Sequence, residues 1–160
     1  MIEVATTSAS GTRAVARAVA ELVRAGDLLV LAGDLGAGKT AFTQGLGAAL
    51  GVTDPITSPT FTLAQRYEGR LRLHHLDVYR LGSLDEVADL DIGELLDDDA
   101  ATVVEWGDSI LGALPADYLE VRFTFGEGDD DRTVAFTAVG PAWAARTAAL
   151  RRALDEVGPC

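Results

Sequence analysis

One glycine-rich octet carries the clearest chemical signal, because it fits the pattern G-x-x-x-x-G-K-[ST] throughout. It reads Gly33, Asp34, Leu35, Gly36, Ala37, Gly38, Lys39 and Thr40. Glycines let the backbone curl until successive amide N–H groups point inward at a phosphate. A helix starting near Lys39 would add its positive dipole end, the lysine would reach the β- and γ-phosphates, and the Thr40 hydroxyl would ligate Mg²⁺. The octet therefore predicts a P-loop that binds a nucleotide with Mg²⁺.

A magnesium ion in such a site needs a further oxygen ligand, usually a carboxylate at the end of a strand. Glu105 ends the apolar run TVVE, and Asp77 ends the run that leads into Val78. We expect one of these acids to hold the metal and the other to orient an attacking water. Which acid has which role stays open. The alternative interpretation of Asp77 is an acid that caps a turn.

Three further residues have both a chemical and a structural interpretation. His75 lies two residues before Asp77, so both side chains would share one face of a strand, although a lone histidine is more often structural. Thr60 follows the P-loop in a Ser-Pro-Thr-Phe segment, where many P-loop proteins carry a switch that senses the γ-phosphate. Trp106 directly follows Glu105 and is either a core residue or a neighbour of the nucleotide.

The elements that must position these residues are read from apolar periodicity and turn residues. Strands are predicted at 2–6, 27–32 and 101–105, with hairpins at 58–68 and 71–80 and at 118–126 and 132–139. Helices are predicted from a cap at Ser10 to about residue 24, from Lys39 to about residue 50, over 83–98 in two short pieces, and over 141–156 with Trp143, Leu150 and Leu154 inward. The sum is a three-layer α/β, P-loop NTPase-like domain whose mixed sheet carries antiparallel hairpins. We expect a single domain over 1–160, in which 141–160 form a C-terminal helix and tail.

The bulk composition limits the expected partners and compartment. The net charge is −12, and such a surface repels phosphate backbones, so we expect no DNA binding. We expect no membrane contact, since no apolar run approaches the roughly 18 residues of a membrane span. The only cysteine is Cys160, which rules out an intramolecular disulfide and fits the reducing cytoplasm.

Several classes of P-loop protein compete at this point. A GTPase would need an [NT]-K-x-D motif, which cannot exist because Lys39 is the only lysine. A small-molecule kinase would normally carry an arginine-bearing lid, and residues 81–100 contain no arginine. That absence weakens the small-molecule interpretation, and a protein kinase of P-loop type stays open. A regulatory ATPase, whose nucleotide state sets contact with a partner, fits the short chain best. The alternative outside the enzymes is a nucleotide-binding module that does not hydrolyse ATP.

Taken together, the motifs resemble those of the TsaE (YjeE) ATPases of bacterial tRNA threonylcarbamoyladenosine biosynthesis. The matching segments, in the family's order and spacing, are GDLGAGKT at 33–40, SPTFTL at 58–63, HLDVYRL at 75–81 and VVEWGD at 103–108. The resemblance covers about residues 8 to 140, and the last three segments are far more specific than the first.

This resemblance implies an enzyme that binds ATP and ADP with Mg²⁺ and hydrolyses ATP weakly alone. It implies action with the TsaD and TsaB proteins, which form N6-threonylcarbamoyladenosine at position 37 of tRNAs reading ANN codons. Contact with tRNA would be indirect, through those partners. Hydrolysis would support repeated turnover of the TsaD–TsaB machinery rather than the carbamoyl transfer itself.

The resemblance also implies a role for each candidate residue. Lys39 looks like the phosphate-binding lysine, and Thr40 and Glu105 look like the Mg²⁺-associated pair. Asp77 resembles the family's switch aspartate and is also a candidate metal ligand. The remaining nucleotide-binding candidates are the other P-loop residues, Ala41 through its backbone, Thr60 as the switch threonine, Trp106, Asp108 and Arg132. An adenine pocket is expected between residues 8 and 12.

Overall fold

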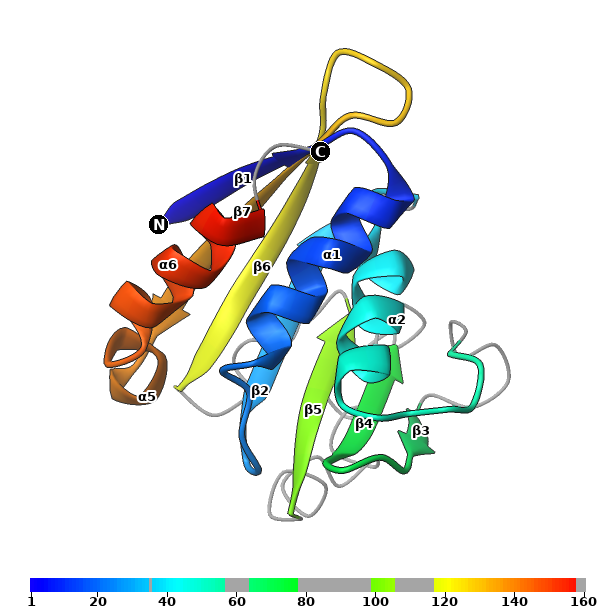
Figure 1. The fold of residues 1–160 in the computed structure, drawn as a ribbon, viewed down its shortest axis with the longest axis vertical. Helices are drawn as coiled ribbons and strands as arrows, with labels where there is room; N and C mark the ends of the chain where they lie inside the picture. Colours follow the sequence, from blue (N-terminus) through cyan, green and yellow to red (C-terminus); the bar gives the residue numbers. More distant parts are fainter. Residues whose placement is uncertain (35, 57–63, 78–98, 106–116, 158–160) are drawn as a thin grey trace, which may run out of the picture.

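The computed structural model describes residues 1–34, 36–56, 64–77, 99–105 and 117–157 (Figure 1). Its strands are β1 (Ile2–Thr6), β2 (Leu28–Gly33), β3 (Ala64–Tyr67), β4 (Arg72–Asp77), β5 (Ala100–Glu105), β6 (Tyr118–Phe125) and β7 (Arg132–Val139). Its helices are α1 (Ala9–Ala20), α2 (Lys39–Ala49), α5 (Pro141–Ala144) and α6 (Thr147–Val157). The strands predicted at 2–6, 27–32 and 101–105 are confirmed as β1, β2 and β5, and the helix after the P-loop is confirmed as α2.

The described strands form one seven-stranded sheet in the order β1-β7-β6-β2-β5-β4-β3. In its middle, β6, β2, β5 and β4 run parallel to one another. At its edges, β3 pairs antiparallel with β4, β7 with β6, and β1 with β7. The mixed α/β sheet and the hairpin predicted at 118–126 and 132–139 are therefore confirmed. The hairpin predicted at 58–68 and 71–80 is confirmed where β3 pairs with β4, and its parts at 58–63 and 78–80 lie outside the described residues. β2 and β5 are buried along almost their whole length, because strands inside a parallel sheet are covered on both faces.

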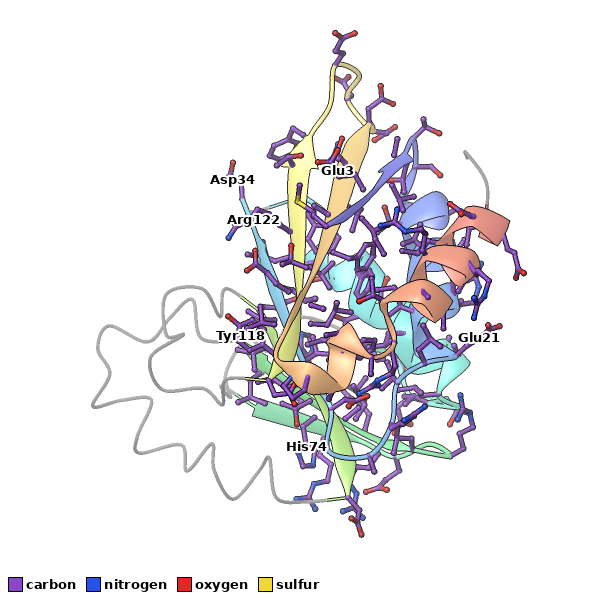
Figure 2. The ribbon with its side chains drawn as sticks, turned by 90° about the vertical axis from the view of Figure 1, so that its left-hand side faces the viewer. Glu3, Glu21, Asp34, His74, Tyr118 and Arg122 are labelled. Atoms are coloured by element: carbon purple, nitrogen blue, oxygen red, sulfur yellow. The ribbon has the colours of Figure 1, made fainter. Side chains whose placement is uncertain are left out.

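Helices α1, α2 and α6 lie on one face of this sheet (Figure 2). The core between them and the sheet contains Leu31 and Val103 from the central strands and Phe42 and Leu46 from α2. Close-packed apolar side chains of this kind fix how α2, and with it the P-loop, lies on the sheet. The helices predicted over 83–98 lie outside the described residues.

The start of the first helix differs from the prediction. Ser8, not Ser10, is the cap, because Ser8 has an extended backbone and its hydroxyl oxygen accepts a hydrogen bond from the Gly11 N–H at 2.9 Å. Ser10 instead lies inside the first turn of α1. The helix also ends at Ala20 rather than near residue 24.

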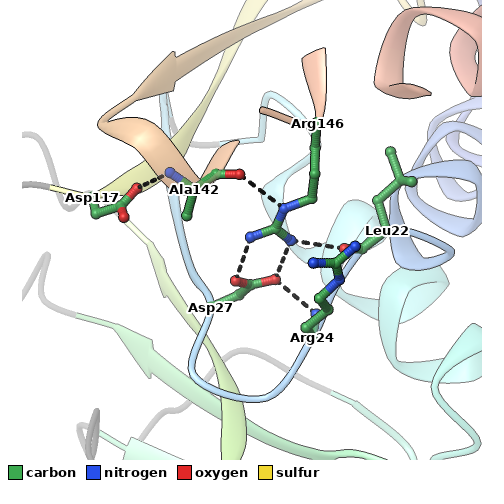
Figure 3. Close-up of polar contacts among 6 residues, drawn as sticks. All are labelled: Leu22, Arg24, Asp27, Asp117, Ala142 and Arg146. Atoms are coloured by element: carbon green, nitrogen blue, oxygen red, sulfur yellow. Dashed lines mark hydrogen bonds and ion pairs between the residues drawn. The ribbon is translucent and has the colours of Figure 1, made fainter. Parts of the chain in front are cut away.

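The C-terminal helix predicted over 141–156 is in fact two helices, α5 and α6. The turn between them contains Arg146, whose guanidinium points back to Asp27 before β2 and to the Leu22 carbonyl oxygen (Figure 3). The turn between the two helices therefore contains the ion pair that joins the C-terminal helices to the segment before β2. The predicted inward side chains are confirmed as buried: Trp143, Leu150 and Leu154.

Candidate nucleotide-binding site

The P-loop leaves the sheet at the carboxyl end of β2 and meets α2 at its first turn. Gly33 has a φ of +151°, and a Cβ there would lie 2.8 Å from the Phe123 carbonyl oxygen of the neighbouring strand β6. Gly38, the N-cap of α2, has a left-handed backbone with a φ of +115°. Side chains with a Cβ are excluded or strained at both positions, which explains why the pattern needs glycine there.

Lys39 folds its side chain back over the loop that precedes it. Its Nζ donates hydrogen bonds to the carbonyl oxygens of Gly33, at 2.7 Å, and Asp34, at 3.0 Å. The residue is only 5% exposed. The one ammonium side chain of the protein is therefore held at the centre of the loop. The other described candidates of the loop differ in burial. Ala37 is buried, Thr40 and Ala41 are half-buried in the first turn of α2, and Asp34 and Gly36 are exposed.

Strand β5 places Glu105 beside this loop. In the parallel sheet, Glu105 is aligned with Leu31 of β2 on one side and with Asp77 of β4 on the other. Carboxyl ends of parallel strands meet at one edge of a sheet, where α/β proteins bind their ligands. Both predicted acids therefore lie at the edge from which the P-loop emerges at Gly33. Glu105 is 3% exposed, and the side chain of Asp77 lies outside the described part of the chain.

His75 lies against Glu105 in the interior. Its Nε2 is 3.3 Å from Glu105 Oε1, and the two side chains are 0% and 4% exposed. Among the described residues, neither His75 nitrogen nor Glu105 Oε1 has a well-aligned hydrogen bond. The sequence alone favours a structural histidine, since a lone histidine is more often structural. The contact with Glu105 depends on the pairing of β4 with β5, which the spacing of residues does not reveal. The sequence indicated only that His75, two residues before Asp77, would lie on the same face of a strand as that acid.

Arg132 reaches the P-loop from the start of β7. Its Nη2 donates to the Gly36 carbonyl oxygen across 3.3 Å, and its Nη1 donates to the carbonyl oxygens of Asp129 and Asp131, both at 2.8 Å. The guanidinium carbon lies 4.6 Å from the centroid of the Phe125 ring. The structure therefore brings a second cation to the loop from 96 positions away in the sequence.

The start of α1 flanks the other side of the loop. A Cβ on Gly38 would lie 3.7 Å from the methyl carbon of Thr12. Thr12 is 2% exposed, and its hydroxyl oxygen lies 3.0 Å from that of Thr6. The segment in which the adenine pocket was expected, 8–12, is thus a neighbour of the P-loop.

Comparisons with known proteins decide the family. A family model described as "Threonylcarbamoyl adenosine biosynthesis protein TsaE" matches residues 6–134. The chain belongs to the TsaE family. Two curated relatives are both named tRNA threonylcarbamoyladenosine biosynthesis protein TsaE. The one from Bacillus subtilis is 44% identical over 130 residues, which is 81% of this chain and 80% of the relative. The one from Streptomyces coelicolor is 45% identical over 139 residues, or 82% of this chain and 93% of the relative.

A solved structure agrees with the TsaE assignment. The crystal structure of Bacillus subtilis YdiB matches with a TM-score of 0.79 and 36% sequence identity, over 94% of each chain. Lys39, Glu105 and Arg132 all lie within the stretch that matches the TsaE family model, whereas α5 and α6 lie beyond it. The resemblance inferred from the motifs is confirmed.

Several features bear on what the TsaE site holds. The remaining candidates Leu35, Thr60, Trp106 and Asp108 lie outside the described residues. Within the described part of the chain, no three His, Cys, Asp or Glu side chains gather as metal ligands. Among the same residues, no helix is long and apolar enough to cross a membrane.

Proposed function

We propose that this chain binds ATP with Mg²⁺, hydrolyses it weakly alone, and supports turnover of the TsaD–TsaB machinery that forms N6-threonylcarbamoyladenosine in tRNA. The observation that carries the proposal is the arrangement at one edge of the sheet. There the P-loop holds the Lys39 ammonium, and Glu105 ends the next parallel strand. Membership of the TsaE family supports the pathway, since its relatives are named for threonylcarbamoyladenosine biosynthesis.

The residues of the loop fit a phosphate. Gly36 has a φ of +82°, and no atom lies within 4 Å of the place where its Cβ would be, so ligand atoms can approach the backbone there. The first amides of α2 point out of its N-terminus, where the helix dipole favours an anion. Lys39 Nζ would exchange its two carbonyl partners for phosphate oxygens, which form hydrogen bonds about twice as strong as neutral ones.

The residues beside the loop fit a magnesium ion. Glu105 is a carboxylate that is only 3% exposed, at the edge of the sheet from which the P-loop emerges. Burial of a carboxylate is costly unless a cation or donors lie near it. Thr40, in the first turn of α2, would supply a hydroxyl ligand, and Glu105 and Asp77 would supply carboxylates directly or through water. A bound Mg²⁺ would neutralise negative charge on the β- and γ-phosphates.

The remaining roles follow from position. We assign Lys39 to phosphate binding and Arg132 to a second contact with the nucleotide, because both side chains already bond to loop carbonyls. The acid that does not hold the metal would orient the attacking water. We also include Thr60, Trp106 and Asp108 in the nucleotide site, on the strength of the family motifs.

The charge of the chain favours protein partners over RNA. A net charge of −12 repels a phosphate backbone, so we propose that tRNA is reached only through TsaD and TsaB. The same partners would place the protein in the cytoplasm.

The test is ATP hydrolysis by the purified chain, alone and with TsaD, TsaB and tRNA, using Lys39→Ala as the control. We expect weak hydrolysis alone, a higher rate with the partners, and loss of both in the variant. Hydrolysis that ignores the partners would count against the proposed role in their turnover. Phosphate transfer that appears only with a small-molecule or protein acceptor would indicate a kinase instead.

A further inference from the structure

The contact between His75 and Glu105 is not explained by phosphate or metal binding alone. His75 is aligned with Val103 of β5, and Glu105 lies two positions further along that strand. Side chains two positions apart on a strand share a face, so Glu105 lies on the same face as Val103 and beside His75. Val103 and Leu73 belong to the core that includes Phe42 of α2. His75 and Glu105 therefore meet beneath the helix that carries the P-loop lysine.

Both side chains are almost fully buried. The Nε2–Oε1 distance is 3.3 Å, with 0% exposure for the His75 side chain and 4% for that of Glu105. Glu105 Oε1, the oxygen that faces His75, is itself buried and has no well-aligned donor among the described residues, so Nε2 at 3.3 Å is its candidate donor. A neutral imidazole carries a hydrogen on only one of its two nitrogens. A carboxylate oxygen beside Nε2 accepts hydrogen bonds, so it favours the tautomer with the hydrogen on Nε2.

We propose that His75 is a positioning residue for Glu105: its Nε2–H donates to Oε1 and turns Oε2 toward the cation of the nucleotide site. A glutamate side chain has several rotatable bonds, so an anchor on one oxygen restricts where the other lies. Residues on both faces of β4 are buried, including His74 at 1% and His75 at 0% exposure, so the imidazole has little room to move. The inference rests on the proposed function, since a fixed direction for Oε2 matters only if a magnesium ion binds in the nucleotide site.

The experiment measures the Mg²⁺ concentration that half-saturates the binding of a fluorescent ADP analogue. It compares the unaltered chain with His75→Ala, His75→Gln and His74→Ala. The glutamine amide places an N–H near the position of Nε2 and keeps a donor for Glu105. His74, also buried but aligned with Thr102, is the matched control for losing an imidazole from the same strand.

We expect His75→Ala to raise the Mg²⁺ midpoint by about 10-fold, the lower end of the effect of removing a group that orients a metal ligand. Binding of the analogue without Mg²⁺ should not change, and His75→Gln should recover most of the lost Mg²⁺ affinity. His74→Ala should keep the midpoint of the unaltered chain. In hydrolysis assays, the loss in His75→Ala should shrink as Mg²⁺ is raised.

An unchanged midpoint in His75→Ala, or an equal shift in His74→Ala, overturns the inference and leaves the proposed function intact. If the unaltered chain shows no Mg²⁺-dependent nucleotide binding, the proposed function itself fails, and the inference with it. NMR of the unaltered chain, labelled at the nitrogens of its two histidines, gives a readout that needs no variant. A hydrogen on Nε2 of His75 supports the anchor, and a hydrogen on Nδ1 alone overturns it.

Discussion

Arg132 Nη2 donates a hydrogen bond to the Gly36 carbonyl oxygen across 3.3 Å, and so ties the β6–β7 hairpin to the P-loop. The other terminal nitrogen is held by the carbonyls of Asp129 and Asp131. Carbonyl oxygens orient a guanidinium without neutralising it. Within the described residues, no carboxylate pairs with Arg132, so its positive charge remains available to an anion in the loop.

Replacement of Arg132 by alanine should weaken ATP and ADP binding by at least 10-fold, because hydrogen bonds to charged groups contribute about 1.5–3 kcal/mol. Arg132→Lys should recover only part of this, since an ammonium cannot keep the carbonyl contacts and reach a phosphate at once. Titration with a fluorescent nucleotide gives both affinities. The control is Arg152→Ala, which removes an exposed arginine from α6. An equal loss in that control would mean that only net charge matters.

Lys39 and Glu105 should differ in which step they support. Lys39→Ala removes the ammonium that we propose faces the β- and γ-phosphates, and it should weaken nucleotide binding itself. Glu105→Ala should spare binding more than turnover, because an acid beside the metal acts mainly on the reacting state. Equilibrium titration and single-turnover hydrolysis separate the two effects. Equal loss of binding in both variants would contradict this division of labour.

The strands and helix around the P-loop could be predicted from local sequence. Buried parallel strands need continuous apolar side chains, and the runs at 27–32 and 101–105 have them. The octet at 33–40 then specifies a turn and a helix start, because its glycines serve conformations that other residues rarely adopt. The acid at Glu105 was predictable because it ends such a run.

Contacts that depend on strand order could not be predicted in the same way. His75 meets Glu105 only because β4 pairs with β5, and Arg132 meets Gly36 only because β6 lies beside β2. Helix boundaries depend on similarly small differences. Ser8 and the serine at position 10 have the same capping chemistry, and the extended backbone of Ser8 alone decides between them.

Helices α1 and α2 cross at a glycine that should not tolerate alanine. Alanine in a helix interior is normally about 1 kcal/mol better than glycine. At Gly45, however, the new Cβ would overlap the carbonyl oxygen of Arg13, which is backbone and has no rotamer to change. At Gly47, the obstacle is the methyl end of Ile56, which can rotate away. We therefore expect Gly45→Ala to lower the free energy of unfolding by about 1–3 kcal/mol.

Gly47→Ala is the matched control for this prediction, because it makes the same chemical change in the same helix. It should cost clearly less than Gly45→Ala in urea denaturation followed by circular dichroism. If Gly45→Ala instead stabilised the protein, helix propensity would outweigh the clash, and the two helices would have to cross less closely than the structure shows.

The ion pair between Asp27 and Arg146 joins the segment before β2 to the turn between α5 and α6 (Figure 3). Arg146 Nη1 donates to Asp27 Oδ2 at 2.6 Å, and Nη2 donates to Oδ1 at 2.8 Å. The guanidinium also bonds to the carbonyls of Leu22 and Ala142 and stacks on the Trp143 ring. The hydrogen bond to Asp27 raises the pKa of Arg146 against the opposing effect of burial. A base whose pKa is raised on folding contributes stability that is fully present at every pH below its pKa in the unfolded chain. For an arginine that pKa lies far above neutrality, so the stability contributed by Arg146 should not vary with pH near neutrality.

Asp27→Ala should therefore lower the free energy of unfolding strongly. The two side chains are only 9% and 10% exposed, and removal of one partner from a buried pair costs about 3–5 kcal/mol. The control is Arg122→Ala, which breaks a pair with Glu120 that is 45% and 22% exposed and should cost about 1 kcal/mol or less. Urea denaturation measures both. The double variant Asp27→Ala with Arg146→Ala should lose less than the sum of the single losses, because it leaves no unpaired buried charge. Additive losses, or a cost for Asp27→Ala no greater than that of the control, would show that the pair does not hold the C-terminal helices in place.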